Sequence, residues 1–290
     1  MAAAGVISVL LGKNRAGEIM ASLHCRSLWI SDVHLGFKEC KAEFLLDFLR
    51  QSECERLYLI GDLIDFWSLQ KGGRWSATHG EVLKTILAKA RAGTRVIYVP
   101  GNHDDVARDY LGLRIGEIEI VPEIIHLTAD GRRFLVTHGD ECDSAVRCGG
   151  PLLNGLGDWA YDLLLFLNRW CNRWRRRLNY PYWSLASFLK QRIGRATTYI
   201  ARFEAAAAHE AMRRGLDGVI CGHIHHAALR DIHGVLYCND GDWVESCTAL
   251  VERVDGTLEI LRWTEQRAVV MAREPRGLPE TAPVPGWAAG

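Results

Sequence analysis

Short apolar runs alternate along the chain with longer segments in which apolar residues recur at every third or fourth position. The runs at residues 57–60, 96–99 and 218–221 have the length and composition of buried β-strands. Residues 41–50 and 81–92 carry apolar side chains on one face, which predicts two amphipathic helices. Strands that alternate with helices in this way predict a mixed α/β fold built around a sheet.

Five of the predicted strands end in a short polar sequence that contains Asp, Asn or His close to glycine. These sequences are Asp32-Val33-His34, Gly61-Asp62, Gly101-Asn102-His103-Asp104, His138-Gly139-Asp140 and Gly222-His223-Ile224-His225. Each of them alone is ordinary turn chemistry. Ligands of α/β sheets, however, bind beyond the carboxyl ends of the strands. Five such sequences in one chain are hard to attribute to turns, and they predict a shared site.

The side chains at these strand ends have the chemistry of metal ligands. The candidate ligands are Asp32, His34, Asp62, Asn102, His138, His223 and His225. Seven oxygen and nitrogen donors exceed what one ion takes, but they suit two ions that share a carboxylate. Donors of this kind without cysteine favour Mn, Fe, Zn or Mg.

Length and composition are those of a globular protein with one large domain. The chain has 290 residues and a formal net charge of zero, so the whole molecule exerts no electrostatic attraction on nucleic acid. Its nine cysteines are scattered, which indicates a reducing cytosol rather than a disulfide framework. No apolar run approaches the roughly 20 residues that a membrane-spanning helix needs.

The two ends of the chain differ in composition from the part between them. The first strand is expected to begin near Ser27, which leaves residues 1–24 as a disordered leader or makes Met20 the working start. Residues 274–290 contain four prolines among Gly and Ala, as is typical of a flexible tail. The domain is therefore expected to span residues 25–273.

The series Asp-x-His, Gly-Asp-x-x-Asp, Gly-Asn-His-Asp, His-Gly-Asp and Gly-His-x-His resembles the motif set of the calcineurin-like metallophosphoesterases over residues 27–263. The resemblance implies a four-layer αββα sandwich and a two-metal centre. One ion would be held by Asp32, His34, Asp62 and His225, and the other by Asp62, Asn102, His138 and His223. Asp62 would bridge the two ions.

The resemblance also assigns the catalytic residues. His103 falls on the catalytic histidine of the Gly-Asn-His-Asp motif, and Asp104 would orient its ring. A protonated His103 would stabilise charge on the phosphoryl group or protonate the leaving oxygen. The alternative role for His103 is that of a turn residue before the next helix.

Residues 151–205 form the predicted helical cap, which is inserted between His138 and His223. The segment is rich in Trp, Leu and Arg, the composition of an interfacial anchor on an anionic membrane. There are two alternatives: the cap only packs on the sandwich, or it binds nucleic acid. The apolar stretch at residues 163–167 favours lipid. Lys190 and Arg195 are the candidate substrate-binding residues of the cap.

Within the superfamily, the cap and residues 237–246 resemble the UDP-2,3-diacylglucosamine diphosphatases. These are peripheral membrane enzymes of lipid A synthesis that usually use manganese and release UMP. The best-known branch has arginine where this chain has His103, which indicates a related branch. The expected partners are a nucleotide-linked glycolipid and the cytoplasmic face of the inner membrane; nucleic acid is disfavoured and no protein partner is predicted.

Two other hypotheses remain open at this point. One is a soluble metallophosphodiesterase that acts on nucleotides or nucleic acid. The other is a scaffold that keeps the fold without its metals, against which the complete ligand set argues.

Overall fold

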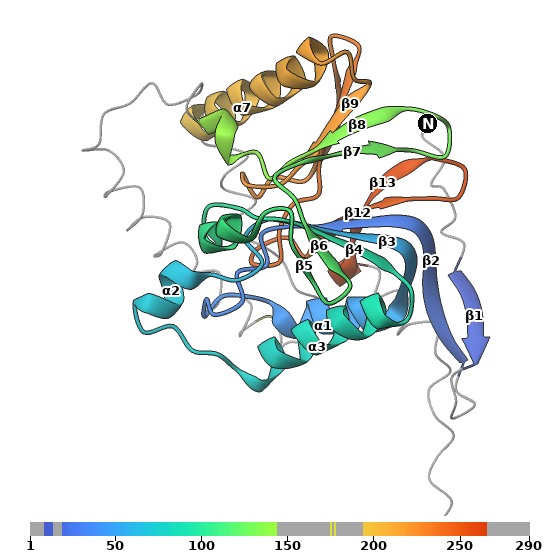
Figure 1. Ribbon diagram of the computed structural model, residues 1–290, viewed down its shortest axis with the longest axis vertical. Coiled ribbons are helices and arrows are strands. Elements are labelled where there is room, and N and C mark those ends of the chain that lie inside the picture. Colours follow the sequence, from blue (N-terminus) through green and yellow to red (C-terminus); the bar gives the residue numbers. More distant parts are fainter. Residues whose placement is uncertain (1–8, 14–18, 144–174, 176, 178–193, 266–290) are drawn as a thin grey trace, which may run out of the picture.

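Two β-sheets lie face to face between outer helices, so the protein has four layers (Figure 1). The computed structural model describes residues 9–13, 19–143, 175, 177 and 194–265. Helices α1 and α3 cover the outer face of the larger sheet, and helix α7 covers the smaller one. This arrangement confirms the predicted αββα sandwich.

The larger sheet has eight strands in the order β13-β12-β2-β3-β4-β6-β5, with β1 added to β2. Strands β2, β3, β4 and β6 are parallel neighbours, so their carboxyl ends share one edge of the sheet. The bounds are β1 Val9–Lys13, β2 Ile19–Ile30, β3 Ser52–Ile60, β4 Arg95–Val99, β5 Arg114–Ile115, β6 Ile118–Ile120, β12 Thr248–Glu252 and β13 Leu258–Arg262.

The smaller sheet has five strands in the order β10-β11-β9-β8-β7. Its central strands β11, β9 and β8 are parallel, and β10 and β7 pair antiparallel at the two edges. The bounds are β7 Ile124–Leu127, β8 Arg133–Val136, β9 Gly218–Cys221, β10 Ala228–Ile232 and β11 Val235–Asn239.

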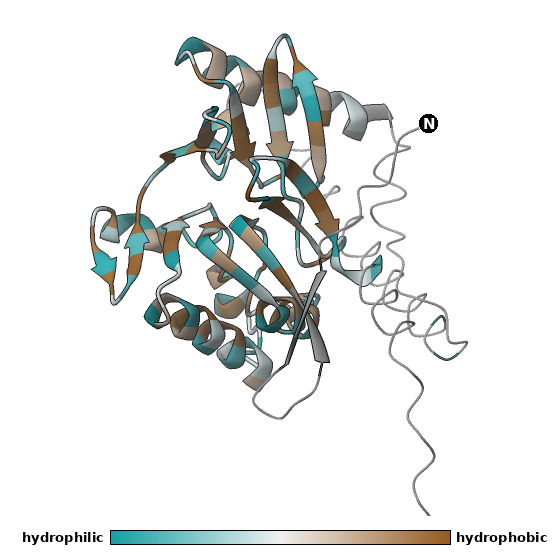
Figure 2. Ribbon diagram, turned by 90° about the vertical axis from the view of Figure 1, so that its right-hand side faces the viewer, coloured by the Kyte–Doolittle hydropathy of each residue, from teal (hydrophilic) through white to brown (hydrophobic). Residues whose placement is uncertain are grey.

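The helices bury one face each, as their apolar spacing predicts. The bounds are α1 Ala42–Gln51, α2 Phe66–Gln70, α3 Ala77–Arg91 and α7 Gly194–Arg213, with 3₁₀ helices η1 Asp105–Tyr110 and η2 Asp140–Cys142. Helix α1 buries Leu45, Phe48 and Leu49, positions three and four apart that lie on one side of a helix. Hydrophobic and hydrophilic positions are interspersed along the helices in Figure 2. Helix α3 begins at a capping box in which the side chains of Ser76 and His79 bond each other's backbone.

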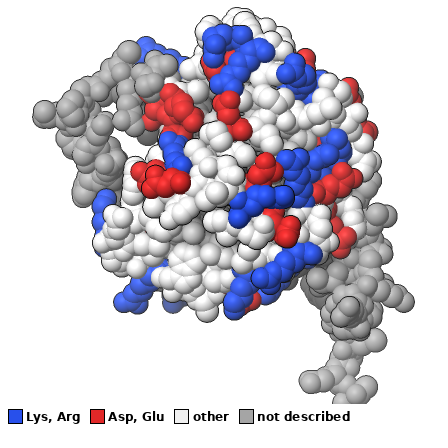
Figure 3. All heavy atoms as spheres, viewed as in Figure 1, with Lys and Arg blue, Asp and Glu red and all other residues white. Residues whose placement is uncertain are grey.

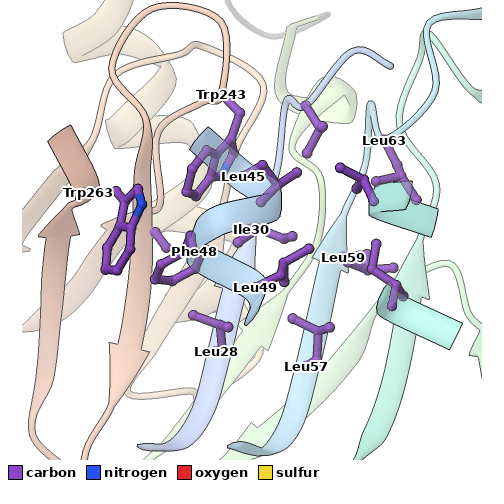
Figure 4. Packing of buried hydrophobic residues seen from close by; sticks show 14 of the residues in the cluster. Leu28, Ile30, Leu45, Phe48, Leu49, Leu57, Leu59, Leu63, Trp243 and Trp263 are labelled. Carbon is purple, nitrogen blue, oxygen red and sulfur yellow. The ribbon is translucent and has the colours of Figure 1, made fainter. Parts of the chain in front are cut away.

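Two apolar layers hold the larger sheet in place. On its outer face, Leu28, Leu57 and Leu59 belong to one cluster with Phe48, whose ring contacts Trp243 and Trp263 (Figure 4). On its inner face, side chains of both sheets meet in a second cluster. Its buried members are Trp29, Tyr58, Ile60, Ile97, Phe134, Val136, Ile220, Cys238 and Leu250. Strands β2 and β3 are thus buried on both faces, which fixes the position of their carboxyl ends.

The structure agrees with the predicted elements in the middle of the chain and differs near its start. The strands expected at 57–60, 96–99 and 218–221 and the helices expected at 41–50 and 81–92 are all present. Residues 9–13 and 19–23, however, pair as antiparallel strands. The prediction that these residues are disordered is therefore wrong. An edge strand gains its order from pairing, which a short apolar run does not reveal.

The expected cap is described only at its end. Residues 194–205, which the sequence assigned to the cap, belong to α7, the outer layer of the sandwich. Ile200, Phe203 and Ala207 of that helix pack on the smaller sheet. The rest of the cap, apart from residues 175 and 177, lies outside the described residues, as does the expected tail at 274–290.

The described surface carries both signs of charge. On the face seen in Figure 3, basic and acidic side chains lie next to one another. Ion pairs between described residues include Arg95–Glu119 at 3.0 Å and Arg132–Asp130 at 2.7 Å. Within the described residues, no helix has the length and apolar character needed to cross a membrane.

Candidate metal centre

The predicted ligands follow strands from both sheets, and the structure brings them together at one edge of the sandwich. Strands β2, β3 and β4 end just before Asp32, Asp62 and Asn102, and strands β8 and β9 end just before His138 and the 223–225 loop. Within each sheet these ligand-bearing strands run parallel to one another, so their ends converge as the strand-end hypothesis requires.

Backbone strain is concentrated at these ligands. Seven described non-glycine residues have positive φ, in the left-handed region that side chains disfavour. Five of the seven are candidate ligands: Asp32, His34, Asp62, His223 and His225, with φ of 50°, 54°, 52°, 69° and 52°. Such conformations cost about 1–3 kcal/mol each and persist where the surrounding structure imposes them.

Asp32, His34 and His225 form the first cluster. The Oδ1 atom of Asp32 lies 3.1 Å from His225 Nε2 and 3.9 Å from His34 Nε2. The two Nε2 atoms are 3.3 Å apart. One carboxylate oxygen and two ring nitrogens therefore face a common point, with a mutual spacing that a single ion can satisfy.

Asp62 lies between this cluster and a second one. Its Oδ2 atom is 3.7 Å from His34 Nε2, and its Oδ1 atom is 3.6 Å from His138 Nε2. The Nε2 atom of His138 is in turn 3.3 Å from Asn102 Oδ1. Each oxygen of one carboxylate thus faces the histidine of a different cluster.

His223 lies beside the second cluster, with its ring centroid 5.1 Å from that of His138. Its Nε2 atom is 3.3 Å from Asp143 Oδ2, and its backbone N–H donates to Asp32 Oδ2 at 2.8 Å. The structure therefore brings all seven predicted ligands to one edge of the sheets, although His223 directs Nε2 toward Asp143.

Two glycines of the motifs are required by close packing at the site. A Cβ atom on Gly61 would lie 2.2 Å from His138 Nδ1, and this residue also has a φ of +73°. A Cβ atom on Gly222 would lie 2.4 Å from Asp32 Oδ2. Any side chain at either position would displace a ligand, which explains the glycine in these two motifs.

The donor atoms fit a bound metal ion. Asp32 is fully buried, and its Oδ2 accepts hydrogen bonds from Ser31 Oγ at 2.5 Å and from the backbone of His223, whereas Oδ1 faces the Nε2 atoms of His225 and His34 at 3.1 and 3.9 Å. A buried carboxylate oxygen that faces two ring nitrogens is stabilised when a cation lies between them. His138 contacts the carbonyl of Ile60 through Nδ1 at 2.9 Å, which leaves the Nε2 lone pair for a metal.

Charge interactions keep the carboxylates of the site ionised. Burial raises the pKa of Asp32, but the neighbouring His225 outweighs it, and the net pKa lies below the ordinary value. The same holds for Asp62, where His138 outweighs burial. The pKa of the buried Asp240, in contrast, is raised by burial, and its Oδ1 atom lies 2.6 Å from Ser31 Oγ. Anionic Asp32 and Asp62 are in the form that binds metal.

His103 lies at the rim of the site, in contact with three neighbours. Its Nδ1 atom is 3.2 Å from Asp65 Oδ1, and its ring centroid is 4.6 Å from that of His34 and 4.2 Å from that of Trp67. Burial lowers the pKa of His103, but Asp65 and Asp62 outweigh it and raise the pKa overall. The cationic form of this imidazole is thus favoured next to the carboxylates.

The predicted role of Asp104 as the residue that orients the His103 ring is wrong. Its carboxylate accepts from the backbone N–H groups of Gly101 at 2.6 Å, Leu63 at 2.7 Å and Asp62 at 3.2 Å. Asp104 therefore ties two strand-end loops together, and Asp65 is the carboxylate that meets the ring. The short side chain of an Asp readily accepts hydrogen bonds from nearby backbone N–H groups, and here it does so instead of contacting the neighbouring ring.

The candidate substrate residues of the cap are not tested. Lys190 lies outside the described residues. Arg195 is in the first turn of α7, and its side chain is not described. Neither is placed at the metal centre by the described part of the chain.

Sequence reasoning missed the residues that support the ligands. Asp65 contacts the Nδ1 atoms of both His34 and His103 at 3.2 Å, and it caps α2 by accepting from Ser68. The only available signal was its place in the Gly-Asp-x-x-Asp motif. Asp143 and Asp240 offered no local signal, because their partners are distant in sequence.

The chain matches a known protein family. A family model for the calcineurin-like phosphoesterases matches residues 25–227. The chain belongs to this family, whose fold implies a dinuclear divalent metal centre and the hydrolysis of phosphate esters or pyrophosphates.

Several named proteins are similar to the chain. It is 27% identical to a UDP-2,3-diacylglucosamine hydrolase of Xanthomonas campestris pv. campestris over 255 residues, which cover 79% of this chain and 96% of that protein. A Neisseria meningitidis serogroup B protein of the same name is 27% identical over 236 residues, covering 79% and 93%. Among solved structures, an archaeal phosphodiesterase has a TM-score of 0.38 and 14% identity, covering 81% of this chain and 98% of that one.

Proposed function

We propose that the protein is a two-metal hydrolase that cleaves the pyrophosphate of UDP-2,3-diacylglucosamine and so releases UMP and 2,3-diacylglucosamine 1-phosphate in lipid A synthesis. The observation that carries the proposal is the convergence of the seven strand-end donors at one edge of the sandwich, where each oxygen of Asp62 faces the histidine of a different cluster. The substrate class is supported by the relatives named for this lipid, with which the chain aligns over 79% of its length.

Two divalent ions would be held by the two clusters, with Asp62 between them. Asp32, His34 and His225 would bind one ion, and Asn102, His138 and His223 the other. Bound ions of this kind activate water and polarise phosphoryl oxygens. Nitrogen and oxygen donors suit manganese, which we propose as the ion in use, over metals that prefer thiolates.

His103 is the proposed proton donor to the leaving phosphate. Asp65 meets its Nδ1 atom at 3.2 Å, which leaves Nε2 as the nitrogen able to reach the substrate. The cationic ring would be attracted to a pyrophosphate and would transfer its Nε2 proton to the oxygen of the departing group. Because Asp65 also contacts His34, the donor and a ligand of the first cluster are held by the same carboxylate.

We further propose that the protein works at the cytoplasmic surface of the inner membrane and contacts it without crossing. The segment that follows His103 exposes Leu113, Ile115 and Tyr110 to 54%, 56% and 50%. An exposed apolar segment suits a substrate with two acyl chains, which has to leave the bilayer to react. The Trp and Arg content of residues 151–205 supports the same contact.

The decisive experiment assays the purified, metal-depleted chain after addition of manganese. Release of UMP from UDP-2,3-diacylglucosamine is expected, with much slower hydrolysis of a simple phosphodiester and of a dinucleotide. The Asp62→Ala variant is the control for contaminating hydrolases. Preference for the simple phosphodiester would instead support a soluble phosphodiesterase, and absence of any hydrolysis in the loaded protein would support a scaffold.

Membrane contact is tested separately by flotation with vesicles that contain anionic lipid. Replacing Arg173, Arg175, Arg176 and Arg177 by Ala should weaken binding to the vesicles, since each basic residue near such a surface contributes about 1 kcal/mol. The remaining binding should depend less on salt concentration. Serine at Leu113 and Ile115 tests the exposed apolar segment. Hydrolysis of a small phosphodiester should stay unchanged, and an equal loss of soluble activity would indicate a structural role instead.

A further inference from the structure

Asp143 connects a ligand of the proposed metal centre to helix α7. The residue follows η2, and its side chain is nearly buried. Its Oδ2 atom lies 3.3 Å from His223 Nε2, and its Oδ1 atom accepts a hydrogen bond from the hydroxyl of Tyr199 at 2.5 Å. One carboxylate thus joins three segments that are far apart in the sequence.

The contact determines which nitrogen of His223 carries a proton. A neutral imidazole has one N–H and one lone pair, and a nitrogen that faces a carboxylate keeps the proton. Here Nε2 faces Asp143, so Nδ1 keeps the lone pair. His34 and His138 have the opposite arrangement, because their Nδ1 atoms face Asp65 and the carbonyl of Ile60.

We propose that Asp143, held in place by Tyr199, is a positioning residue that keeps the proton of His223 on Nε2 and presents Nδ1 to the second metal ion. The inference rests on the two-metal site of the proposed function. It deepens that proposal by distinguishing His223 from the other candidate histidines. Among the described candidate ligands, only His223 directs Nε2 toward a carboxylate that is not itself a candidate ligand, that of Asp143.

Tyr199 and the backbone of His223 complete the arrangement. The tyrosine hydroxyl occupies Oδ1 of Asp143, which leaves Oδ2 to meet the ring. The ring lies near Phe203 of α7, at 5.9 Å between centroids, and its backbone N–H is bonded to Asp32. Carboxylates that contact a ligand histidine in this way fix its orientation, and their loss typically weakens metal binding about 10–100-fold.

The first test measures binding of Mn²⁺ to the full-length protein by calorimetry. Asp143→Ala should weaken the binding of one of the two ions by about 10–100-fold and leave the affinity for the other ion unchanged. Asp143→Asn keeps an acceptor oxygen and should lose less, and Tyr199→Phe should cause a smaller loss of the same ion. The matched control is Asp140→Ala, on the same turn, whose carboxylate pairs with Arg108 at 2.8 Å instead of with a histidine.

The second test reads the tautomer of His223 in the metal-free protein from the ¹⁵N shifts of its ring, assigned with a His223→Gln variant. The proton is expected on Nε2 in the unchanged chain and in Asp140→Ala, and in both tautomers in Asp143→Ala. A proton on Nδ1 in the unchanged chain, or unchanged affinity for both ions in Asp143→Ala and Tyr199→Phe, would overturn the proposal. Neither readout uses the lipid substrate, so a failed lipid assay leaves the inference standing.

Discussion

The replacement Glu252→Gln should lower the stability of the protein in a way that depends on pH. Glu252 lies on β12 of the larger sheet, with its side chain 0% exposed. Its carboxylate accepts from Arg26 at 2.6 Å, Ser27 at 2.7 Å and the backbone of Ala129 at 2.7 Å, and it contacts His126 of the smaller sheet at 3.0 Å. The group therefore connects the two sheets on their inner faces.

The size of the effect follows from the pKa of this carboxyl. Burial raises the pKa of Glu252, but the contacts with His126, Ser27, Ala129 and Arg26 outweigh it and lower the pKa from 4.5 to about 2. A difference of about 2.5 units corresponds to about 3 kcal/mol of stability at neutral pH. Because the folded-state pKa is depressed, this stabilisation is present above about pH 4.5 and is lost as the pH falls toward about 2.

Urea denaturation of the metal-depleted protein at pH 7, 5 and 3 measures the effect, with tryptophan fluorescence as the signal. The difference between the unchanged chain and Glu252→Gln should be about 3 kcal/mol at pH 7 and pH 5, and it should shrink to about 1 kcal/mol near pH 3. The control is Glu259→Gln on the neighbouring strand β13. Glu259 pairs with Arg253 at 2.7 Å with partly exposed side chains, so its loss should cost less than about 1 kcal/mol.

Two results would refute this reasoning. One is a Glu252→Gln variant that is no less stable at pH 7 than Glu259→Gln. The other is a stability difference that stays constant from pH 7 to pH 3, because the lost stabilisation would then not depend on the charge of the carboxylate.

Four further changes test the candidate site. His103→Ala should retain both ions in elemental analysis and slow turnover by about 10²–10⁴-fold, and loss of an ion would contradict the catalytic role. Asp62→Ala should lose at least one ion per chain, whereas two retained ions with near-normal activity would disprove the bridging role. Gly61→Ala should disturb metal binding, because its Cβ would lie 2.2 Å from His138 Nδ1. Asp65→Asn should lower the pKa of His103, which Asp65 helps to raise, so the loss of activity at alkaline pH should begin at lower pH.

The amino-acid sequence by itself determined the buried strands and the identity of the candidate ligands, and the resemblance of its motifs to a known family implied the sandwich. Buried strands are visible as apolar runs, and each ligand follows such a run by one to four residues, so both are local patterns. The glycines at positions 61 and 222 belong to the same patterns, since a Cβ atom at either one would overlap a ligand.

Only the tertiary structure decided which residues support the ligands. Asp143 is 80 residues from His223 in the sequence, and the hydrogen bond from Ser31 to Asp240 spans 209 positions. The pairing of residues 9–13 with β2 and the placement of 194–205 in the outer layer likewise depend on neighbouring segments. Contacts of this kind depend on how strands cross in space, and no periodicity along the chain records them.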